Sequence, residues 1–355
     1  MPKFEEVTQI HTYEQLDRTA WAELVRTSRT GTWFQSPEAY DFFASLPTLF
    51  EPFVLGISNH QSRLRALCVG YVTKETGALK QFFARRAIII GGPALADDCS
   101  NEEVIALMNA VREHLSSPHS LIRSLAHSFT RPIFIETRNF NDYSPWRAAF
   151  ETAGFFYQQH LNFHVDTTID WQERLSDNRK RQIKKVESQK SKVVRCLATS
   201  EQDIREWYDI LTQLYRTKVK TPLFPIDFFL EAYRRNIGHF LLVKQDQHVI
   251  GGSMIALDEK CVYEWFECGL NTEYKDQYPS VMATYSGICF AQSHGCSRYD
   301  MMGAGKPNIP YGVRDFKSEF GGTLVEHGRF LCVCQPFLYR LGKFAVRILK
   351  RNTTN

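Results

Sequence analysis

The sequence predicts an α/β (α+β) protein made of two related domains with mixed, mostly antiparallel sheets. Its 355 residues are too many for one ordinary domain. Apolar segments typical of strands alternate with segments of helical periodicity. Both halves also follow the same order: helices, two or three antiparallel strands, a helix, a strand, and then a short helix and a strand. We place the boundary near residues 165–171, which gives an N-terminal domain at 1–167 and a C-terminal domain at 168–355.

The first half begins with a predicted helix at a capping box formed by Thr12 and Gln15. Pro37 suits the first turn of a second, aromatic-rich helix, since its fixed φ is already helical. Ser100 and Glu103 cap a longer helix with one apolar face. The other segments are predicted as strands at 53–57, 64–72, 87–90 and 132–137, a short helix at 146–152 and an extended segment at 155–165.

The second half begins with a charged helix near Trp171. Ser200 and Asp203 open an amphipathic helix, a further helix follows Pro225, and Pro279 stands where an apolar helix should start. The other segments are predicted as strands at 193–198, 240–244, 249–257, 261–268, 297–302 and 323–333, followed by a final helix at 336–350.

Residues 301–322, with the sequence MMGAGKPNIPYGVRDFKSEFGG, are too rich in glycine and proline to predict either a helix or a strand. Glycine lets the backbone approach a ligand closely, and proline stiffens the loop around it. Three cations in this stretch lie close to three aromatic residues: Lys306, Arg314 and Lys317, with Tyr311, Phe316 and Phe320. The stretch is therefore either a binding loop placed after a strand or an Ω-loop whose aromatic side chains fill a core.

The composition is that of a globular protein with a net charge of only +4. An electrostatic partner must therefore be bound by a local patch rather than by the overall field. The nine cysteines are odd in number and lack disulfide or zinc spacing, which indicates reduced thiols and no metal site. The N-terminus lacks the features of a signal peptide, and no apolar stretch approaches the ~20 residues of a membrane span. We expect a soluble, cytoplasmic protein.

A helix near residues 175–187 is strongly basic. Arg179 lies four residues from both Leu175 and Ile183, so it falls within the apolar stripe of this helix. A cation there is either paired at a domain interface or directed into a cleft. The remaining basic residues suit the binding of phosphate groups, although such a run is also typical of a solvated face. They are Lys180, Arg181, Lys184, Lys185, Lys190 and Lys192.

The final helix is also basic, with apolar residues between its cations. Such a helix either rests on an anionic membrane surface, here the inner face of the membrane, or packs its apolar side on its own domain. Its cations are Arg340, Lys343, Arg347, Lys350 and Arg351.

Residues 311–322, YGVRDFKSEFGG, resemble the C-terminal signature of the Fem family. Three weaker stretches agree: WFQSPE at 33–38, RKRQIKK at 179–185, and residues 295–303 with Tyr299 and Asp300. Fem proteins are tandem-GNAT transferases that add amino acids to peptidoglycan precursors. The order of elements in the second half is likewise that of the GNAT acyltransferase fold, so the resemblance implies two tandem GNAT-like domains.

The resemblance implies an enzyme that transfers an aminoacyl or other acyl group to a primary amine. The acceptor would be a small molecule, nucleotide-linked or lipid-linked, and the donor either an aminoacyl-tRNA or an acyl-CoA. Partners would then be the amine, tRNA and peripherally the membrane, with no DNA and no bound cofactor. The family's functional Phe-Lys pair falls on Phe316 and Lys317, which become the expected catalytic residues. The expected substrate-binding residues are Tyr311, Gly312, Arg314, Lys306, Gly303 and Arg179.

Acyl transfer to an amine requires a stabilised oxyanion and a proton acceptor. Lys317 is the expected cation beside the donor ester. The proton acceptor stays open at this point. Glu264 and Glu267 are three residues apart on one predicted strand and should point to opposite faces, so that at most one faces the site. Asp300, at the end of the next strand, is another candidate.

The turn before the helix that starts at Pro279 bears on whether the acyl donor is an acyl-CoA. Acyl-CoA enzymes of this fold bind the pyrophosphate on a glycine-rich turn at this helix N-terminus. Residues 271–280 contain no glycine, Pro279 has no N–H group, and Glu273 and Asp276 would repel an anion. The sequence therefore argues against a standard CoA site in the second half.

These observations favour an N-acyltransferase or aminoacyltransferase acting on an amine of a cell-envelope precursor of the peptidoglycan type. Two alternatives remain open. One is a CoA-dependent N-acyltransferase for an amino sugar of a surface polysaccharide. The other is a non-catalytic protein that binds RNA through its basic helix.

Overall fold

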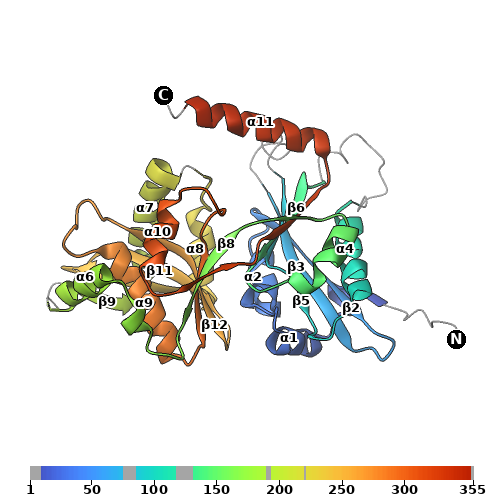
Figure 1. The fold of residues 1–355 in the computed structure, drawn as a ribbon, viewed down its shortest axis with the longest axis horizontal. Helices are drawn as coiled ribbons and strands as arrows, with labels where there is room; N and C mark the ends of the chain where they lie inside the picture. Colours follow the sequence, from blue (N-terminus) through green and yellow to red (C-terminus); the bar gives the residue numbers. More distant parts are fainter. Residues whose placement is uncertain (1–8, 75–84, 117–130, 189–192, 220, 353–355) are drawn as a thin grey trace. The chain divides into compact units, whose positions relative to one another are not determined.

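The computed structural model describes residues 9–74, 85–116, 131–188, 193–219 and 221–352 (Figure 1). The chain forms two compact units. The first unit comprises Met1–Gln159 together with His327–Asn355, and the second comprises His160–Glu326. Each unit contains a mixed, mainly antiparallel sheet with helices on it. The predicted fold class is confirmed.

The sheet of the first unit has the strand order β1-β2-β3-β4-β6-β15-β7, with β5 paired to β3. All its described pairings are antiparallel except that of β4 with β6. Its strands are β1 (Gln9–Thr12), β2 (Phe50–Ser58), β3 (Leu64–Thr73), β4 (Ala87–Gly91), β5 (Ala94–Leu95), β6 (Phe134–Asn139), β7 (Phe156–Gln158) and β15 (Arg329–Val333).

The helices of this unit are α1 (Arg18–Thr27), α2 (Pro37–Ala44), α4 (Asn101–Ser116), α5 (Arg147–Thr152) and α11 (Pro336–Asn352), with short 3₁₀ turns η1 (Tyr13–Gln15), η2 (Trp33–Gln35) and η4 (Ser144–Trp146). The capping box of Thr12 and Gln15 is present, but it closes η1 and not α1. Instead, α1 begins after Asp17, whose Oδ1 accepts a hydrogen bond of 2.8 Å from the Ala20 N–H. Pro37 occupies the first turn of α2, as predicted.

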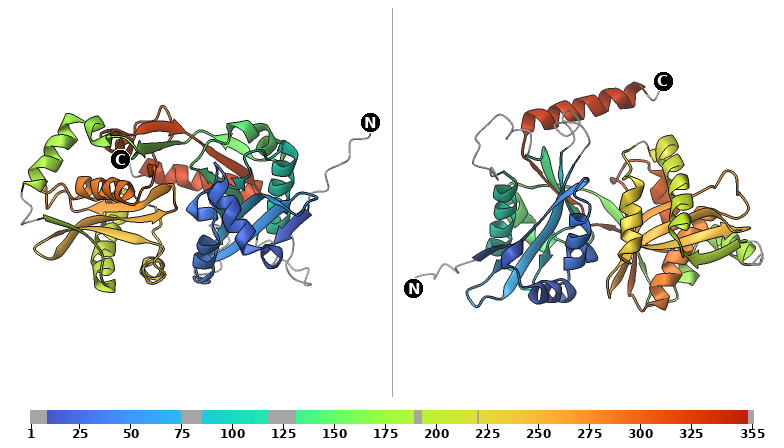
Figure 2. Two further views of the ribbon diagram at one scale, coloured as in Figure 1. Left: turned by 90° about the horizontal axis from the view of Figure 1, so that it is seen from below. Right: turned by 180° about the vertical axis from the view of Figure 1, so that it is seen from behind.

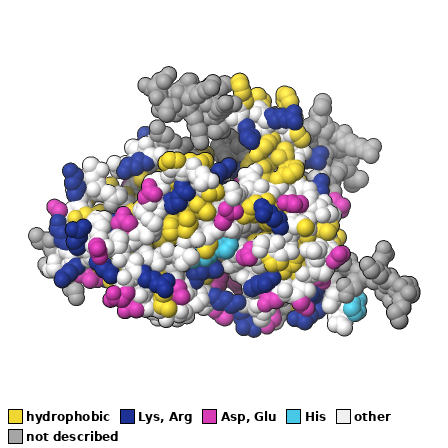
Figure 3. Space-filling model, in the orientation of Figure 1, with side chains coloured by type: hydrophobic (Ala, Val, Ile, Leu, Met, Phe, Trp, Pro, Cys, Tyr) yellow, Lys and Arg dark blue, Asp and Glu magenta, His cyan; other side chains and the backbone are white. Residues whose placement is uncertain are grey.

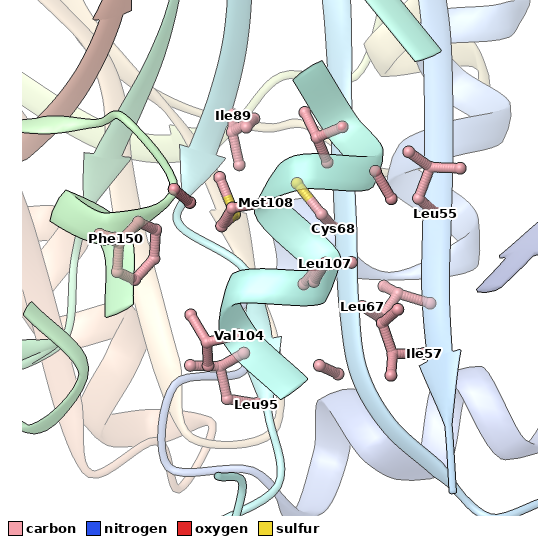
Figure 4. Close-up of a cluster of buried hydrophobic side chains, with 14 of the residues drawn as sticks. Leu55, Ile57, Leu67, Cys68, Ile89, Leu95, Val104, Leu107, Met108 and Phe150 are labelled. Atoms are coloured by element: carbon pink, nitrogen blue, oxygen red, sulfur yellow. The ribbon is translucent and has the colours of Figure 1, made fainter. Parts of the chain in front are cut away.

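The core of the first unit lies between α4 and the sheet (Figure 4). Val104, Leu107 and Met108 recur at helical spacing along α4 and are all buried. They lie over strand residues that include Leu55 and Cys68. Burying each large aliphatic side chain contributes about 1.5–3 kcal/mol, so this helix face holds much of the unit together.

Gln35 bridges β3 and β4 where these two strands part. They are paired only at Tyr71 with Ile88 and at Val72 with Ala87. Beyond these pairs, the Gln35 Nε2 donates hydrogen bonds to Val69 O (3.0 Å) and to Ile90 O (2.8 Å), and its Oε1 accepts one from the Val69 N–H (2.7 Å). The amide therefore replaces the missing pairing between the strands, and its side chain is fully buried.

The second unit contains a seven-stranded sheet among the described residues, in the order β14-β8-β13-β12-β11-β10-β9. Within it, β12 and β13 are parallel and the other pairs are antiparallel. Its strands are β8 (Leu161–Asp166), β9 (Val193–Leu197), β10 (His239–Gln245), β11 (His248–Leu257), β12 (Cys261–Gly269), β13 (Arg298–Gly303) and β14 (Thr323–Glu326).

Helices cover both faces of this second sheet (Figure 2). On one face α9 packs against β10, β11 and β12, while α7 and α8 pack on the other. Residues of α9 are buried on nearly all sides, which explains its apolar sequence. The helical segments of the unit are η5 (Trp171–Arg174), α6 (Asp177–Glu187), α7 (Glu201–Leu214), the π-helix η6 (Tyr215–Val219), α8 (Ile226–Arg234), α9 (Pro279–Ser293) and α10 (Gly312–Ser318).

The structure divides the chain differently from a single boundary between 1–167 and 168–355. The extended segment predicted at 155–165 is two strands, β7 in the first sheet and β8 in the second. The strand predicted at 323–333 is likewise β14 in the second sheet and β15 in the first. Gly328, between the latter two, has a φ of +65° that favours glycine. An apolar pattern predicts that a segment is extended, but it does not tell which sheet pairs with it.

The expectation that residues 301–322 contain neither helix nor strand is wrong. The strand β13 continues to Gly303, and residues Gly312–Ser318 form α10. The glycines and prolines of the stretch lie mostly between or outside these two elements, whereas VRDFKS within α10 has no helix breaker.

We predict that Gln35→Ala lowers the free energy of unfolding by about 2–4 kcal/mol. The substitution leaves the backbone groups of Val69 and Ile90 buried without their partner. Urea unfolding of the full chain, followed through the first unit's transition, measures this. Gln61→Ala, at an exposed position between β2 and β3, is the matched control and should change stability by less than about 0.5 kcal/mol. Equal effects of the two substitutions would contradict the bridging role.

Candidate functional site

The strands β12 and β13 of the second unit are paired for only part of their length. Their parallel pairing joins Cys261 to Arg298 and continues to Tyr263 with Asp300. After that point β12 runs on to Gly269 and β13 to Gly303 without being paired to each other. Backbone polar groups that leave a sheet need other partners. The side chains between the parted strands form the candidate site.

Lys317 supplies some of those partners from α10. Its Nζ donates hydrogen bonds to the carbonyl oxygens of Met301 and of Gly303, the latter at 2.9 Å. The side chain is buried, with 8% of its surface exposed. Burial lowers the pKa of Lys317, while the nearby carboxylates of Glu264, Asp300 and Glu267 act to raise it. Lys317 thus holds the end of β13 and brings a cation among acidic groups.

Glu264 and Glu267 lie on the same face of the sheet, contrary to the prediction that they point to opposite faces. In the pairing of β12 with β11, Ile255 lies opposite Glu264 and Met254 opposite Phe266, so Trp265 is an extra residue. Such a β-bulge shifts the side-chain alternation by one residue. The rings of Trp265 and Phe266 accordingly both contact Phe228 of α8, with centroids 5.3 and 6.1 Å away. The two carboxylates face α9 on the opposite side.

Glu264 is held by two hydroxyl groups. Thr284 of α9 and Tyr299 of β13 each donate a hydrogen bond of 2.8 Å to its Oε1. The Tyr299 hydroxyl can reach this position because Gly287 leaves space, where a Cβ would lie 2.2 Å from the hydroxyl oxygen. Burial raises the pKa of Glu264, and Lys317 acts to lower it. Glu264 is therefore a fixed, buried carboxylate with its partners in place.

Glu267 is less satisfied. Its Oε1 is buried and has no hydrogen-bond partner among the described residues. Ser253 is the residue opposite it on β11, and the buried Oγ of Ser253 also lacks a partner in the described chain. Burial and the charge of Glu264 raise the pKa of Glu267 to about 8, while Ser280 and Lys317 act to lower it. A carboxylate with a free oxygen and a pKa near neutrality is suited to accept a proton.

Asp300 has a structural role. It is fully buried, and its Oδ2 lies 3.1 Å from His164 Nε2 on the adjacent β8. Its Oδ1 accepts a hydrogen bond of 2.7 Å from the N–H of Met302, which has a φ of +61°. Burial acts to raise the pKa of Asp300, but His164 and Arg298 outweigh it, and the pKa lies below its usual value. Asp300 is an anchor of the strand end and a weaker candidate for the proton acceptor than Glu267.

Arg179 joins α6 to α10. Its guanidinium lies over the rings of Phe316 and Phe320, 4.6 and 5.0 Å from their centroids. It also lies 3.6 Å from a carboxylate oxygen of Glu319 and donates a hydrogen bond of 2.6 Å to Gln182. Of the two predicted roles for this buried cation, the structure therefore shows the paired one, although within the second unit. Phe316, expected in the catalytic pair, contributes its ring to this contact.

The loop between β13 and α10 is held together by Arg314. The guanidinium donates hydrogen bonds to the carbonyl oxygens of Lys306 (3.1 Å) and Ile309. Tyr311 is exposed and its ring lies against Gly305, where a Cβ would be 2.9 Å from Cδ1 of the ring. Lys306 and Gly312 are exposed as well. The expected binding residues thus form three groups: Lys317 with Gly303, Arg179 with Phe316, and Arg314 with Lys306 and Tyr311.

The basic helix α6 is partly neutralised. Lys185 forms an ion pair of 2.5 Å with Asp276, and Lys180 donates a hydrogen bond of 2.8 Å to the Glu173 carbonyl. Arg181 and Lys184 are exposed at the surface. Lys190 and Lys192 lie outside the described residues. The patch that remains for phosphate groups is smaller than the sequence alone indicates.

Asn271 occupies the N-terminus of α9. Its Oδ1 accepts a hydrogen bond of 3.2 Å from the Ser280 N–H, and its Nδ2 donates one of 2.7 Å to the Ser280 hydroxyl. Pro279 has no N–H group, and the Met282 N–H is bonded to Tyr278. The groups that would bind a pyrophosphate at this helix terminus are therefore largely engaged.

The first unit does not repeat this arrangement. There, β4 and β6 occupy the places of β12 and β13 in the order of elements, and they stay paired from Ala87 with Ile135 to Gly91 with Asn139. All five residues of β4 are paired, so these two strands leave no opening between them. Of the two parallel strand pairs among the described residues, β12 with β13 parts and β4 with β6 does not.

The structure contains no group of three or more histidine, cysteine, aspartate or glutamate residues suited to a metal, as far as its described residues show. All nine cysteines are described, and all are free thiols. In the same part of the chain no helix is both long and apolar enough to cross a membrane.

Comparison with known proteins identifies the second unit. A family model described as "Acetyltransferase (GNAT) domain" matches residues 174–318, a range that contains both parted strands and Lys317. Comparison with curated proteins gives no match. The match shows that the chain carries a GNAT domain, and it confirms the predicted acyltransferase class.

Three solved structures share the fold over nearly the whole chain. FemX has a TM-score of 0.68 at 11% identity, covering 94% of this chain and 99% of its own. A tandem GNAT protein from the clavulanic acid biosynthesis pathway has a TM-score of 0.56 at 8% identity, with coverages of 92% and 98%. L-PGS from Bacillus licheniformis has a TM-score of 0.54 at 10% identity, with coverages of 94% and 97%. The predicted tandem GNAT fold is confirmed.

Several residues of the site are not among those predicted from the sequence. Ser253, Ser280 and Thr284 face the two carboxylates, and Asn271 caps α9. Ser280 and Thr284 are four residues apart on a mostly apolar helix, a spacing that places both hydroxyls on one face. The sequence therefore contains enough information to predict that these two hydroxyls share one face of the helix. The bulge at Trp265, which aligns the carboxylates with these hydroxyls, has no comparable signal in the sequence.

We predict that Glu267 makes the protein less stable as the pH rises. Its pKa is about 8 when folded and near 4.5 when unfolded, so the unfolded chain releases this proton first. Stability from this group is therefore lost between about pH 4.5 and pH 8. Glu267→Gln removes the titration and should raise the Tm above that of the parent at pH 9, with a smaller difference at pH 5.

Thermal unfolding in matched buffers at both pH values measures the effect. Glu273→Gln, at an exposed position of the turn before α9, is the control. It should change the Tm by the same small amount at pH 5 and at pH 9. If Glu267→Gln also gives the same shift at pH 5 and pH 9, then Glu267 does not have a raised pKa.

Proposed function

We propose that this protein transfers an aminoacyl or other acyl group to a primary amine of a cell-envelope precursor of the peptidoglycan type. The observation that carries the proposal is Glu267, a buried carboxylate with an unpartnered oxygen and a raised pKa between the parted strands of a GNAT domain. The Fem-type signature at residues 311–322 and the likeness to FemX support the acceptor class.

In the proposed reaction the amine attacks the acyl carbonyl and forms a tetrahedral oxyanion. The new C–N bond forms as Glu267 takes a proton from the amine nitrogen. Collapse of the intermediate breaks the bond between the acyl carbon and the donor oxygen or sulfur. That leaving group receives the proton from Glu267, which returns to its carboxylate form. No redox partner or metal is needed for this balance.

Lys317 would act mainly by positioning in this scheme. Its ammonium group is already bonded to the carbonyl oxygens of Met301 and Gly303, and its charge acts to lower the pKa of Glu267. It would therefore keep the end of β13 in place and keep the carboxylate ionisable near neutral pH. Since Lys317→Ala also removes two buried hydrogen bonds, loss of activity in that variant alone would not separate catalysis from folding.

For the donor we propose an aminoacyl-tRNA. Asn271 engages the first free N–H of α9, and Glu273 adds negative charge to the same turn, while Asp276 is paired with Lys185. Both features disfavour the pyrophosphate of CoA at this helix. The exposed cations of α6 are available for RNA phosphates. A CoA-dependent transfer to an amino sugar is the alternative, favoured by the "Acetyltransferase" description of the matching family.

We predict that Glu267→Gln lowers kcat by about 10²–10³-fold, because it removes the proton acceptor but keeps the shape. The parent's kcat should rise with pH up to about 8 and then level off, and this rise should be absent in the variant. The assay follows a labelled aminoacyl group from its tRNA to a UDP-linked muropeptide amine. Glu273→Gln is the control and should keep the parent's activity and pH profile. A Glu267→Gln variant with parental kcat would contradict the assignment.

We further predict that aminoacyl-tRNA raises the Tm of the protein and that acetyl-CoA does not. A ligand that binds only the folded state at a hundredfold excess over its Kd stabilises by about 2.7 kcal/mol. Thermal shift of the full chain with each donor measures this. A shift with acetyl-CoA and none with aminoacyl-tRNA would favour the amino-sugar acyltransferase. Tight RNA binding without any acyl transfer would favour the non-catalytic alternative.

A further inference from the structure

The helix α11 exposes three large apolar side chains among its residues described up to Phe344. It follows β15 directly in the first unit (Figure 1). Leu338 is buried, and the ring of Tyr339 contacts Phe134 with centroids 5.8 Å apart. By contrast, Phe337, Leu341 and Phe344 are 77%, 42% and 62% exposed. Of the two predicted roles for this helix, packing on its own domain therefore accounts for the contacts of Leu338 and Tyr339 but not for the exposed residues described up to Phe344.

These exposed residues lie on one face of α11. Positions 337, 341 and 344 are related by steps of four and three residues, which align side chains along one side of a helix. Singly exposed apolar residues are normal, whereas two phenylalanines and a leucine in a row form a patch that marks an interaction site. We call Phe337, Leu341 and Phe344 the aromatic face of α11.

All charges of α11 are positive. The helix contains no acidic residue. Its five cations are Arg340, Lys343, Arg347, Lys350 and Arg351. Arg340 and Lys343 are exposed and alternate with the aromatic face along the chain. Figure 3 shows hydrophobic side chains beside lysine and arginine at the upper edge of the molecule, where α11 lies. The side chains beyond Phe344 are outside the described part, but their residue types continue the pattern.

We propose that α11 binds the surface of an anionic lipid bilayer. A helix with apolar and basic faces lies in the plane of the membrane interface, with its apolar side among the acyl chains and its cations at the anionic headgroups. The charged residues of α11 are all basic, so their charge is complementary to that of anionic headgroups. The same charges disfavour a second copy of α11 as the occupant, because the cations would repel each other. A nucleic acid would pair the cations but leave the phenylalanines in water.

The proposal does not depend on the proposed acyl transfer, because it rests on another unit and on different residues. It is compatible with a helix that lies on the membrane without crossing it, as none of the described helices meets the requirements for a span. Each basic residue near an anionic surface strengthens binding by about fivefold, so removing two should weaken it by more than tenfold.

The test measures co-sedimentation of the full-length chain with vesicles. One set contains phosphatidylcholine alone, and the other contains it with about one third phosphatidylglycerol. We expect binding to the anionic vesicles that falls as salt is raised, and at least tenfold weaker binding to the neutral ones. Phe337→Ser with Phe344→Ser should reduce anionic binding at least tenfold, and so should Arg340→Glu with Lys343→Glu.

Two matched variants control for exposed aromatic area and for net charge. Phe156→Ser removes another exposed phenylalanine of the first unit, and Arg63→Glu with Lys260→Glu gives the same change in charge at other exposed positions. Both should bind like the parent, and every variant should keep the parental Tm. No binding by the parent, or equal loss in controls and α11 variants, would overturn the proposal. So would a dimer, detected by light scattering, that Phe337→Ser with Phe344→Ser dissociates.

Discussion

The second unit depends on the electrostatic balance around Lys317. Two parallel strands part, and the buried ammonium of Lys317 compensates for the lost pairing by binding two carbonyl oxygens of β13. A buried cation is costly unless acidic groups lie nearby. Glu264, Glu267 and Asp300 supply that negative charge. The opening between the strands therefore rests on the interactions of these four side chains.

The three acidic residues of this cluster differ in how fully they are satisfied. Asp300 has His164 and a backbone N–H, and Glu264 has two hydroxyl donors. Glu267 retains a buried oxygen without a partner in the described chain. Groups whose environments push their pKa values apart take different roles in a site. The environment thus sets Glu267 apart from Glu264 and Asp300, whose side chains are held by hydrogen-bond donors.

The two units use one fold for different ends. In the second unit β12 and β13 part, and the charged side chains of Lys317, Glu264 and Glu267 lie between them. In the first unit β4 and β6 stay paired, and the place where its strands do separate, between β3 and β4, is filled by the amide of Gln35. The aromatic face of α11, which is exposed in this first unit, suits an interaction surface and not a reaction.

The sequence by itself determined the elements and the class of protein. Periodicity located nearly all strands and helices, caps such as Pro37 and Pro279 located helix starts, and the stretch around Lys317 indicated an acyltransferase of tandem GNAT fold. Only the tertiary structure decided which sheet takes β8 and β15, because the pairing partner of a strand is not encoded in its own apolar pattern. It also decided that Glu264 and Glu267 share a face. A bulge depends on the register with the neighbouring strand, and one extra residue reverses every side chain beyond it.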